Sequence, residues 1–174
     1  QILAGLERSS ADIVFLCEHD VLYHKTHFEF TPLNDSVYYY NENTYKVDLE
    51  SGQALFYFTK QTSGLCAHRS LLLKHYRKRV EMVESAGVYD KNMGYEPGCH
   101  RPPHGVDKHP TEKWMSAFPN IDVRHGGNWT RSRWSQSQFR NQNTCLGWTM
   151  ADEVPGWGLT KGRMPQFIEE LRNV

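Results

Sequence analysis

The stretch ADIVFLCEHDVLYH, residues 11–24, decides how the fold is interpreted. The apolar run Ile13-Val14-Phe15-Leu16 stops at the turn Glu18-His19-Asp20, and apolar residues then resume. A short apolar run without alternation is typical of a strand that is buried on both faces. We therefore expect a central strand over 12–17, with two carboxylates placed at its carboxyl end.

Outward from this stretch, the pattern predicts an α/β fold with a mixed sheet flanked by helices. Ile2, Leu3 and Leu6 share one face at helical spacing, which predicts a helix over 1–8. Alternating, turn-bounded segments predict further strands. These are 37–41, 44–48 and 54–59, which we expect to form an antiparallel meander, and 120–125.

The clearest helix is predicted over 70–87, with Ser70 as its N-cap and Gly87 as its C-cap. Its expected apolar face consists of Leu72, Tyr76, Val80 and Val83. The segment 88–118 is rich in Gly and Pro, and a loop of that length inside a domain is usually functional or disordered. A short helix is expected at the C-terminal end, from Met164.

Composition narrows the function classes. The chain has 174 residues, with 20 acidic and 20 basic side chains, so no broad basic field is available to attract nucleic acid. No apolar run reaches the ~20 residues of a membrane span. The four cysteines form no CxxC pair, which favours a reduced, cytoplasmic protein. We expect a single catalytic domain over 1–174.

Glu18 and Asp20 are the first candidate site residues. On an extended chain, residues two apart point to the same side, so these carboxylates would lie together and repel each other. Two oxygen ligands at one place suit Mn²⁺ or Mg²⁺, which would remove that repulsion. The alternative is a solvated turn after a strand, where acidic residues are common.

The segment DIVFLCEHDVLY resembles the acid-x-acid motif of nucleotide-sugar glycosyltransferases of the GT-A fold, with Glu18 at the first acidic position. The segment SGLCAHRSLLLKHY, residues 63–76, is similar to the strand end and helix that follow this motif in many of these enzymes. The resemblance covers about residues 1–135. It implies a nucleotide-sugar donor, a divalent cation on its diphosphate, and a saccharide or other hydroxyl acceptor.

The resemblance also bears on the start of the chain. In this family a nucleotide-binding α/β half precedes the acidic motif, and here Gln1 already lies in a helix. We therefore expect the chain to be the C-terminal two-thirds of a catalytic domain, completed by an upstream segment or a partner chain. A short natural variant is the alternative.

A second candidate group lies in DVRHGGNWTRSRW, residues 122–134. In several enzymes of the family a downstream histidine completes the metal site, which implies that role for His125. Arg131 and Arg133 could neutralise the departing diphosphate. The alternative is a histidine at the edge of the core beside two solvated arginines.

The third candidate group lies in YEPGCHRPPHGVDKH, residues 95–109. Glu96 or Asp107 could act as general base on the acceptor hydroxyl, with 88–118 as a lid. Both acids could instead be solvated. Four residues have ligand chemistry for zinc, although their spacing matches no zinc module: Cys99, His100, His104 and His109.

Taken together, the sequence predicts a metal-dependent glycosyltransferase. The alternatives are a non-catalytic carbohydrate-binding or assembly module that uses the aromatic residues, or a metal-dependent hydrolase built on the Cys/His loop.

Overall fold

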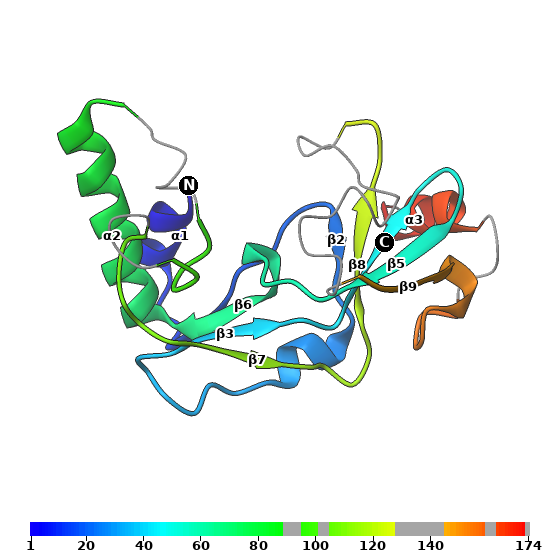
Figure 1. Ribbon diagram of the computed structural model, residues 1–174, viewed down its shortest axis with the longest axis horizontal. Coiled ribbons are helices and arrows are strands. Elements are labelled where there is room, and N and C mark those ends of the chain that lie inside the picture. Colours follow the sequence, from blue (N-terminus) through cyan, green and yellow to red (C-terminus); the bar gives the residue numbers. More distant parts are fainter. Residues whose placement is uncertain (89–94, 101–104, 128–144, 159–162, 173–174) are drawn as a thin grey trace. The chain divides into compact units, whose positions relative to one another are not determined.

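The computed structural model describes residues 1–174 except 89–94, 101–104, 128–144, 159–162 and 173–174 (Figure 1). Its fold is mixed α/β, with one sheet of four strands, one of five, and three α-helices in the described part. The chain divides into two compact units, which we describe separately. Unit 1 consists of Gln1–Cys17, Phe30–Asn41 and Lys60–Trp114, and unit 2 of Glu18–Glu29, Glu42–Thr59 and Met115–Val174.

Unit 1 contains the four-stranded sheet. Its strand order is β1 (Ile13–Phe15), β6 (Leu65–His68), β3 (Tyr38–Asn41) and β7 (Thr111–Trp114). β6 pairs antiparallel with β1 and β3, and β3 pairs parallel with β7. The short 3-10 helix η2 (Thr62–Gly64) leads into β6. Gly64 lies so close to the backbone of β3 that a Cβ atom on it would be 2.6 Å from the carbonyl oxygen of Asn41.

Two helices cover one face of this sheet. α1 (Ile2–Arg8) and α2 (Arg69–Ala86) lie side by side in Figure 1, and Arg77 of α2 forms an ion pair with Glu7 of α1 at 3.1 Å. Tyr38 and Tyr40 point into the core beneath the helices. The other buried members of this core are Leu6, Leu65, Ala67, Leu71, Leu72 and Tyr76.

The predicted central position of strand 12–17 is wrong. β1 is shorter, Ile13–Phe15, and lies at the edge of its sheet, where it pairs only with β6 among the described strands. All three of its residues are half-buried rather than buried. Val14 and Leu16 pack against the core of unit 1, and Ile13 and Phe15, which alternate with them, are half-buried on the other face. The apolar run therefore reflects partial burial at a sheet edge.

The predicted helix is confirmed as α2, with two differences. Gly87 ends it in the left-handed region at φ 64°, as expected, but the N-cap is His68 and no side chain caps the start. The buried face is Leu71, Leu72, His75 and Tyr76. Val80 is exposed, because the core of unit 1 covers only the first half of the helix.

Unit 2 contains the five-stranded sheet. Its strand order is β2 (Val21–Leu22), β8 (Asn120–Arg124), β4 (Thr44–Asp48), β5 (Gln53–Tyr57) and β9 (Cys145–Met150). β4 and β8 pair parallel and the other neighbours pair antiparallel. One face carries the core of unit 2, made of Val47, Ala54, Ile121, Val123, Ala151 and Val154.

The predicted strands exist, but they do not form a single meander. β4 and β5 form a hairpin whose turn uses Gly52 at φ 70°, whereas β3 belongs to the other sheet. The chain therefore passes between the units after Asn41. β7 and β9 were not predicted, and β7 lies within the segment 88–118 that was expected to be a loop.

The remaining elements of unit 2 are short. The 3-10 helix η1 (Lys25–Glu29) follows β2, η6 (Ala151–Glu153) follows β9, and the predicted C-terminal helix is α3 (Met164–Arg172). Phe167 and Ile168 of α3 pack against the core of unit 2. None of the described helices is long and apolar enough to cross a membrane.

Candidate functional site

The Glu18-His19-Asp20 segment lies between β1 and β2 and belongs to unit 2. His19 and Asp20 form a turn, so the chain is not extended here and strand alternation does not bring the two carboxylates to one side. The turn is held by the backbone N–H of Glu18, which donates to the Tyr23 hydroxyl at 2.9 Å. Glu18 is exposed and Asp20 is half-buried.

The pairing of β2 with β8 brings this turn to the predicted histidine segment. Val21 pairs with Asp122, and the backbone N–H of Val123 donates to the carbonyl oxygen of Asp20 at 2.8 Å. His125 follows Val123 by two residues, a span of at most about 7 Å along the chain. Asp20 and His125, 105 positions apart in sequence, thus lie on neighbouring chain segments at one end of the sheet.

The side chains of the described residues do not form a three-ligand cluster here. His125 is exposed, and its Nδ1 accepts a hydrogen bond from the backbone N–H of Gly127 at 3.1 Å, so a metal would bind through Nε2. No three His, Cys, Asp or Glu side chains of the described residues are grouped closely enough to hold a metal ion. The donor chemistry of Glu18, Asp20 and His125 suits Mn²⁺ or Mg²⁺, whereas their present arrangement is not a coordination sphere.

Asp122 is an acidic residue at this end of the sheet that the sequence interpretation missed. It is 4% exposed and pairs with Arg124 at 3.2 Å. Burial raises the pKa of Asp122, and the charge of Asp20 adds to this, while Arg124 and Lys46 oppose it. The alternation in NIDVR, with Asn120, Asp122 and Arg124 on one face and Ile121 and Val123 in the core, was the available signal.

Two histidines fix η1 and the residue before it to the start of β8, at the opposite end of that strand from His125. The Asn120 side chain accepts from the backbone N–H of His24 at 3.3 Å and donates from Nδ2 to His27 Nδ1 at 3.0 Å. His27 is therefore a neutral tautomer protonated at Nε2. Burial lowers the pKa of His27 to about 4, which agrees with a structural and uncharged ring.

Asp107, a predicted general base, lies in unit 1 at the centre of a buried polar cluster. Its Oδ2 accepts from the Tyr38 hydroxyl at 2.8 Å and from His75 Nδ1 at 2.7 Å, and its Oδ1 accepts from the His109 N–H at 3.1 Å. Burial alone would raise the pKa of Asp107, but the hydrogen bonds from His75, Tyr38 and His109 outweigh burial and lower it. A carboxylate so stabilised is a weaker base than a free one.

His75 connects this cluster to α2. Its side chain is 1% exposed, and no described residue pairs with its Nε2. The ring packs edge-on against Tyr38, with centroids 5.8 Å apart. The arrangement fastens the 105–109 segment to β3 and α2, and its burial gives a substrate no direct path to the ring.

Glu96, the other predicted base, also lies in unit 1 and is half-buried. Its charge contributes to raising the pKa of Tyr40 and Tyr76, which burial raises most. The neighbouring Pro97 carbonyl accepts from the Tyr40 hydroxyl at 2.7 Å. Glu96 therefore lies near Tyr40 and Tyr76 of the core of unit 1.

The remaining predicted residues do not form a site that the structure describes. Arg131, Arg133 and His104 lie outside the described residues. Cys99, His100 and His109 are described, but they form no metal-binding group. The ring of His100 packs on Tyr95 at 3.8 Å between centroids, and His109 Nδ1 lies 3.1 Å from the Ser36 carbonyl oxygen.

Comparison with known proteins gives no relative. No protein-family model, no curated protein and no solved structure matches the chain. Any assignment of function therefore depends on the residues and their arrangement.

Proposed function

We propose that this protein is a glycosyltransferase of the GT-A type that uses a nucleotide-sugar donor and Mn²⁺ or Mg²⁺. The observation that carries the proposal is the hydrogen bond from Val123 N–H to the Asp20 carbonyl oxygen at 2.8 Å. It supports the pairing of the Glu-His-Asp turn with the segment that ends in His125, the two parts that the family resemblance assigns to one metal site.

In this proposal Glu18 and Asp20 supply hard oxygen ligands, and His125 supplies an imidazole from a different strand. The bound cation would neutralise charge on the donor diphosphate. Asp20 is the central ligand, since it is the half-buried carboxylate hydrogen-bonded through its backbone to β8. For His125 Nε2 to join it, the exposed His125-Gly126-Gly127 segment would have to turn toward Asp20.

One finding weighs against the resemblance. In the family the acidic motif follows a strand buried inside the sheet, whereas β1 lies at a sheet edge and is half-buried. The proposal therefore depends on the Asp20–Val123 pairing and on the residue chemistry, and not on the position of β1.

The test is a thermal-unfolding screen with a panel of nucleotide sugars, with and without Mn²⁺. We expect at least one donor to raise the unfolding temperature when Mn²⁺ is present and to lose that effect in EDTA. Asp20→Asn should remove the donor effect. Asp12→Asn should keep it, because Asp12 is an exposed aspartate of unit 1, eight positions earlier.

Two results would overturn the proposal. The first is a panel in which no nucleotide sugar stabilises the chain at any Mn²⁺ concentration. The second is stabilisation that is equal in the wild type and in Asp20→Asn.

A further inference from the structure

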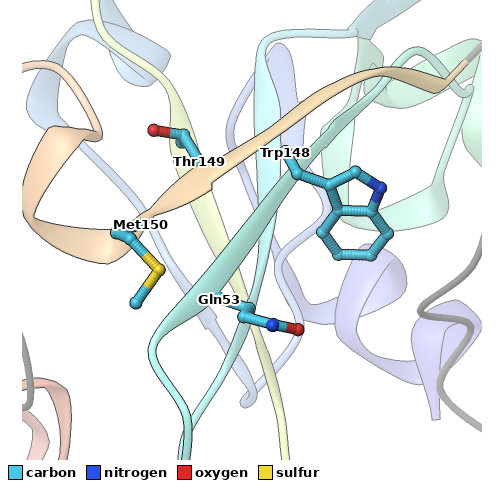
Figure 2. Close-up of a pocket in the computed structure, with 4 residues that line it drawn as sticks. All are labelled: Gln53, Trp148, Thr149 and Met150. Atoms are coloured by element: carbon cyan, nitrogen blue, oxygen red, sulfur yellow. The ribbon is translucent and has the colours of Figure 1, made fainter.

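A hollow of about 460 Å³ lies on the five-stranded sheet of unit 2. It is at the β5–β9 side of the sheet, whereas the Glu-His-Asp turn leads into β2 at the opposite edge. Four residues of β5 and β9 line it: Gln53, Trp148, Thr149 and Met150 (Figure 2). β9 is an edge strand, whereas β2 and β8 are at the opposite side of the sheet. The hollow is therefore distinct from the candidate metal site.

The strand register explains which side chains form the hollow. Gln53 pairs with Met150 and Leu55 with Trp148, so Gln53, Trp148 and Met150 belong to one face. Thr149 pairs with Ala54 of the core, and in Figure 2 its side chain points away from Trp148 and Gln53. The face that carries Trp148 is thus opposite the core of unit 2.

A β-bulge sets the direction of the strand just before Trp148. The register of β5 and β9 shifts between Phe56 and Tyr57, and Gly147 opposite Phe56 has φ 142°. An L side chain rarely adopts that φ, and bulges bend a strand and re-aim the side chains that follow. Trp148 is 40% exposed, an unusual position for the largest aromatic side chain.

The lining has the chemistry of a site for an uncharged polar ligand. Its described lining contains an exposed indole ring and an amide that can both donate and accept, and none of these four residues is charged. The described lining therefore offers no cation to a diphosphate. A pyranose ring matches the lining, because its C–H face can pack on the indole and its hydroxyls can pair with Gln53.

We infer that this hollow binds a neutral saccharide, with Trp148 as the stacking platform and Gln53 as the hydrogen-bonding group. The choice of a saccharide as occupant rests on the proposed function, in which a saccharide is the acceptor. Binding here needs neither a metal ion nor a donor, so it can be measured separately from sugar transfer.

The test is a titration of the 174-residue chain with neutral disaccharides in EDTA. Binding is monitored by tryptophan fluorescence and by NMR. The probes are cellobiose, maltose, lactose, mannobiose and diacetylchitobiose, each to about 10 mM, where a Kd of 1 mM is well resolved. We expect at least one probe to perturb Trp148. Trp148→Ala should weaken its binding at least about tenfold, since stacking on an aromatic ring is worth about one such factor.

Matched variants separate the site from general effects. Gln53→Ala should weaken binding, and Trp148→Phe should retain part of it. Phe28→Ala should leave binding unchanged, because Phe28 is an exposed aromatic residue of unit 2 that does not line the hollow. Asp20→Asn should also bind normally, even if it has lost every donor effect.

Three results would overturn the inference. In the first, no probe perturbs Trp148. In the second, binding survives Trp148→Ala. In the third, the Trp148 signal depends on protein concentration and not on sugar, which would identify a second copy of the chain as the occupant of this edge.

Discussion

The two polar clusters of the molecule differ in which groups hold their acidic residues in place. In unit 1, the Asp107 carboxylate accepts three hydrogen bonds and is enclosed by Tyr38 and a fully buried His75. In unit 2, Glu18 and His125 are exposed and Asp20 is half-buried, and Asp20 is held through its backbone carbonyl. Both clusters were candidate sites by residue type alone.

The difference indicates opposite roles. A carboxylate that accepts three hydrogen bonds stabilises the fold, and removing it leaves the buried Tyr38 and His75 donors without their acceptor. Acidic side chains at an exposed turn add little to stability, so the binding role that the family resemblance implies for them carries no cost to the fold. The Asp107 cluster is thus assigned a structural role, and the proposed function gives the Asp20 turn a binding role.

The largest expected effect is on activity, from Asp20→Asn. It removes one charge from the proposed cation site. Changes to outer-shell partners of a metal typically cost about 10- to 100-fold. Because Asp20 is proposed to contact the metal directly, sugar transfer should fall by at least about 100-fold. Stability should change little, because the backbone bond to Val123 remains. Transfer assays and urea unfolding measure the two quantities. A variant that loses stability and activity in parallel would contradict the binding role.

Asp107→Ala should have the opposite profile. It leaves the Tyr38 hydroxyl and the His75 Nδ1 without their buried acceptor, so the free energy of unfolding should fall by about 3 kcal/mol. Urea unfolding measures this, with Asp35→Ala at an exposed site of unit 1 as the control. If Asp107→Ala kept full stability but lost sugar transfer, Asp107 would again be a candidate for the catalytic base.

The pH dependence of stability should report His27. Its pKa is about 4 when folded and about 6.5 when unfolded, so below pH 6.5 the unfolded chain takes up a proton that the folded chain does not. This contribution to stability is therefore present at pH 7 and lost as the pH falls toward 4. Between pH 6.5 and 4.5 the loss should be roughly 2 kcal/mol.

Urea unfolding at both pH values checks this, in the wild type and in His27→Gln. The variant should lose most of the pH-dependent difference. His19→Gln should keep it, because His19 is exposed in the Glu-His-Asp turn. If the free energy of unfolding fell by the same amount between pH 6.5 and 4.5 in all three proteins, His27 would not be the buried neutral group.

The smallest expected effect is that of His125→Ala. An exposed ligand that completes a metal site from a second strand should raise the Mn²⁺ concentration needed for half-maximal activity by about tenfold, or about 1.4 kcal/mol. Stability should not change. Titration of activity with Mn²⁺ measures the shift, and an unchanged Mn²⁺ requirement would remove His125 from the site.

Local pattern predicted most elements, because helices and strands depend on short-range periodicity. The helices at 1–8 and 70–87 and the strands near 38, 44, 54 and 120 are present within a few residues. β7 and β9 were missed, since Thr111–Trp114 lies in a Pro- and Gly-rich segment and Cys145–Met150 contains Gly147 at a bulge. Gly in a strand weakens the pattern by which strands are found.

The sequence by itself determined that a Glu-His-Asp turn follows a short apolar strand and that a His-Gly-Gly turn follows another strand. It did not determine that β1 is an edge strand, because partial burial at a sheet edge and full burial inside a sheet produce the same apolar run. Tertiary structure decided which acid is held by buried hydrogen-bond donors: Asp107 gains its partners from Tyr38 and His75, 69 and 32 positions away. Tertiary structure also brought Asp20 to Val123. Strand pairing joins segments that are far apart in the chain, and local sequence does not show which segments pair.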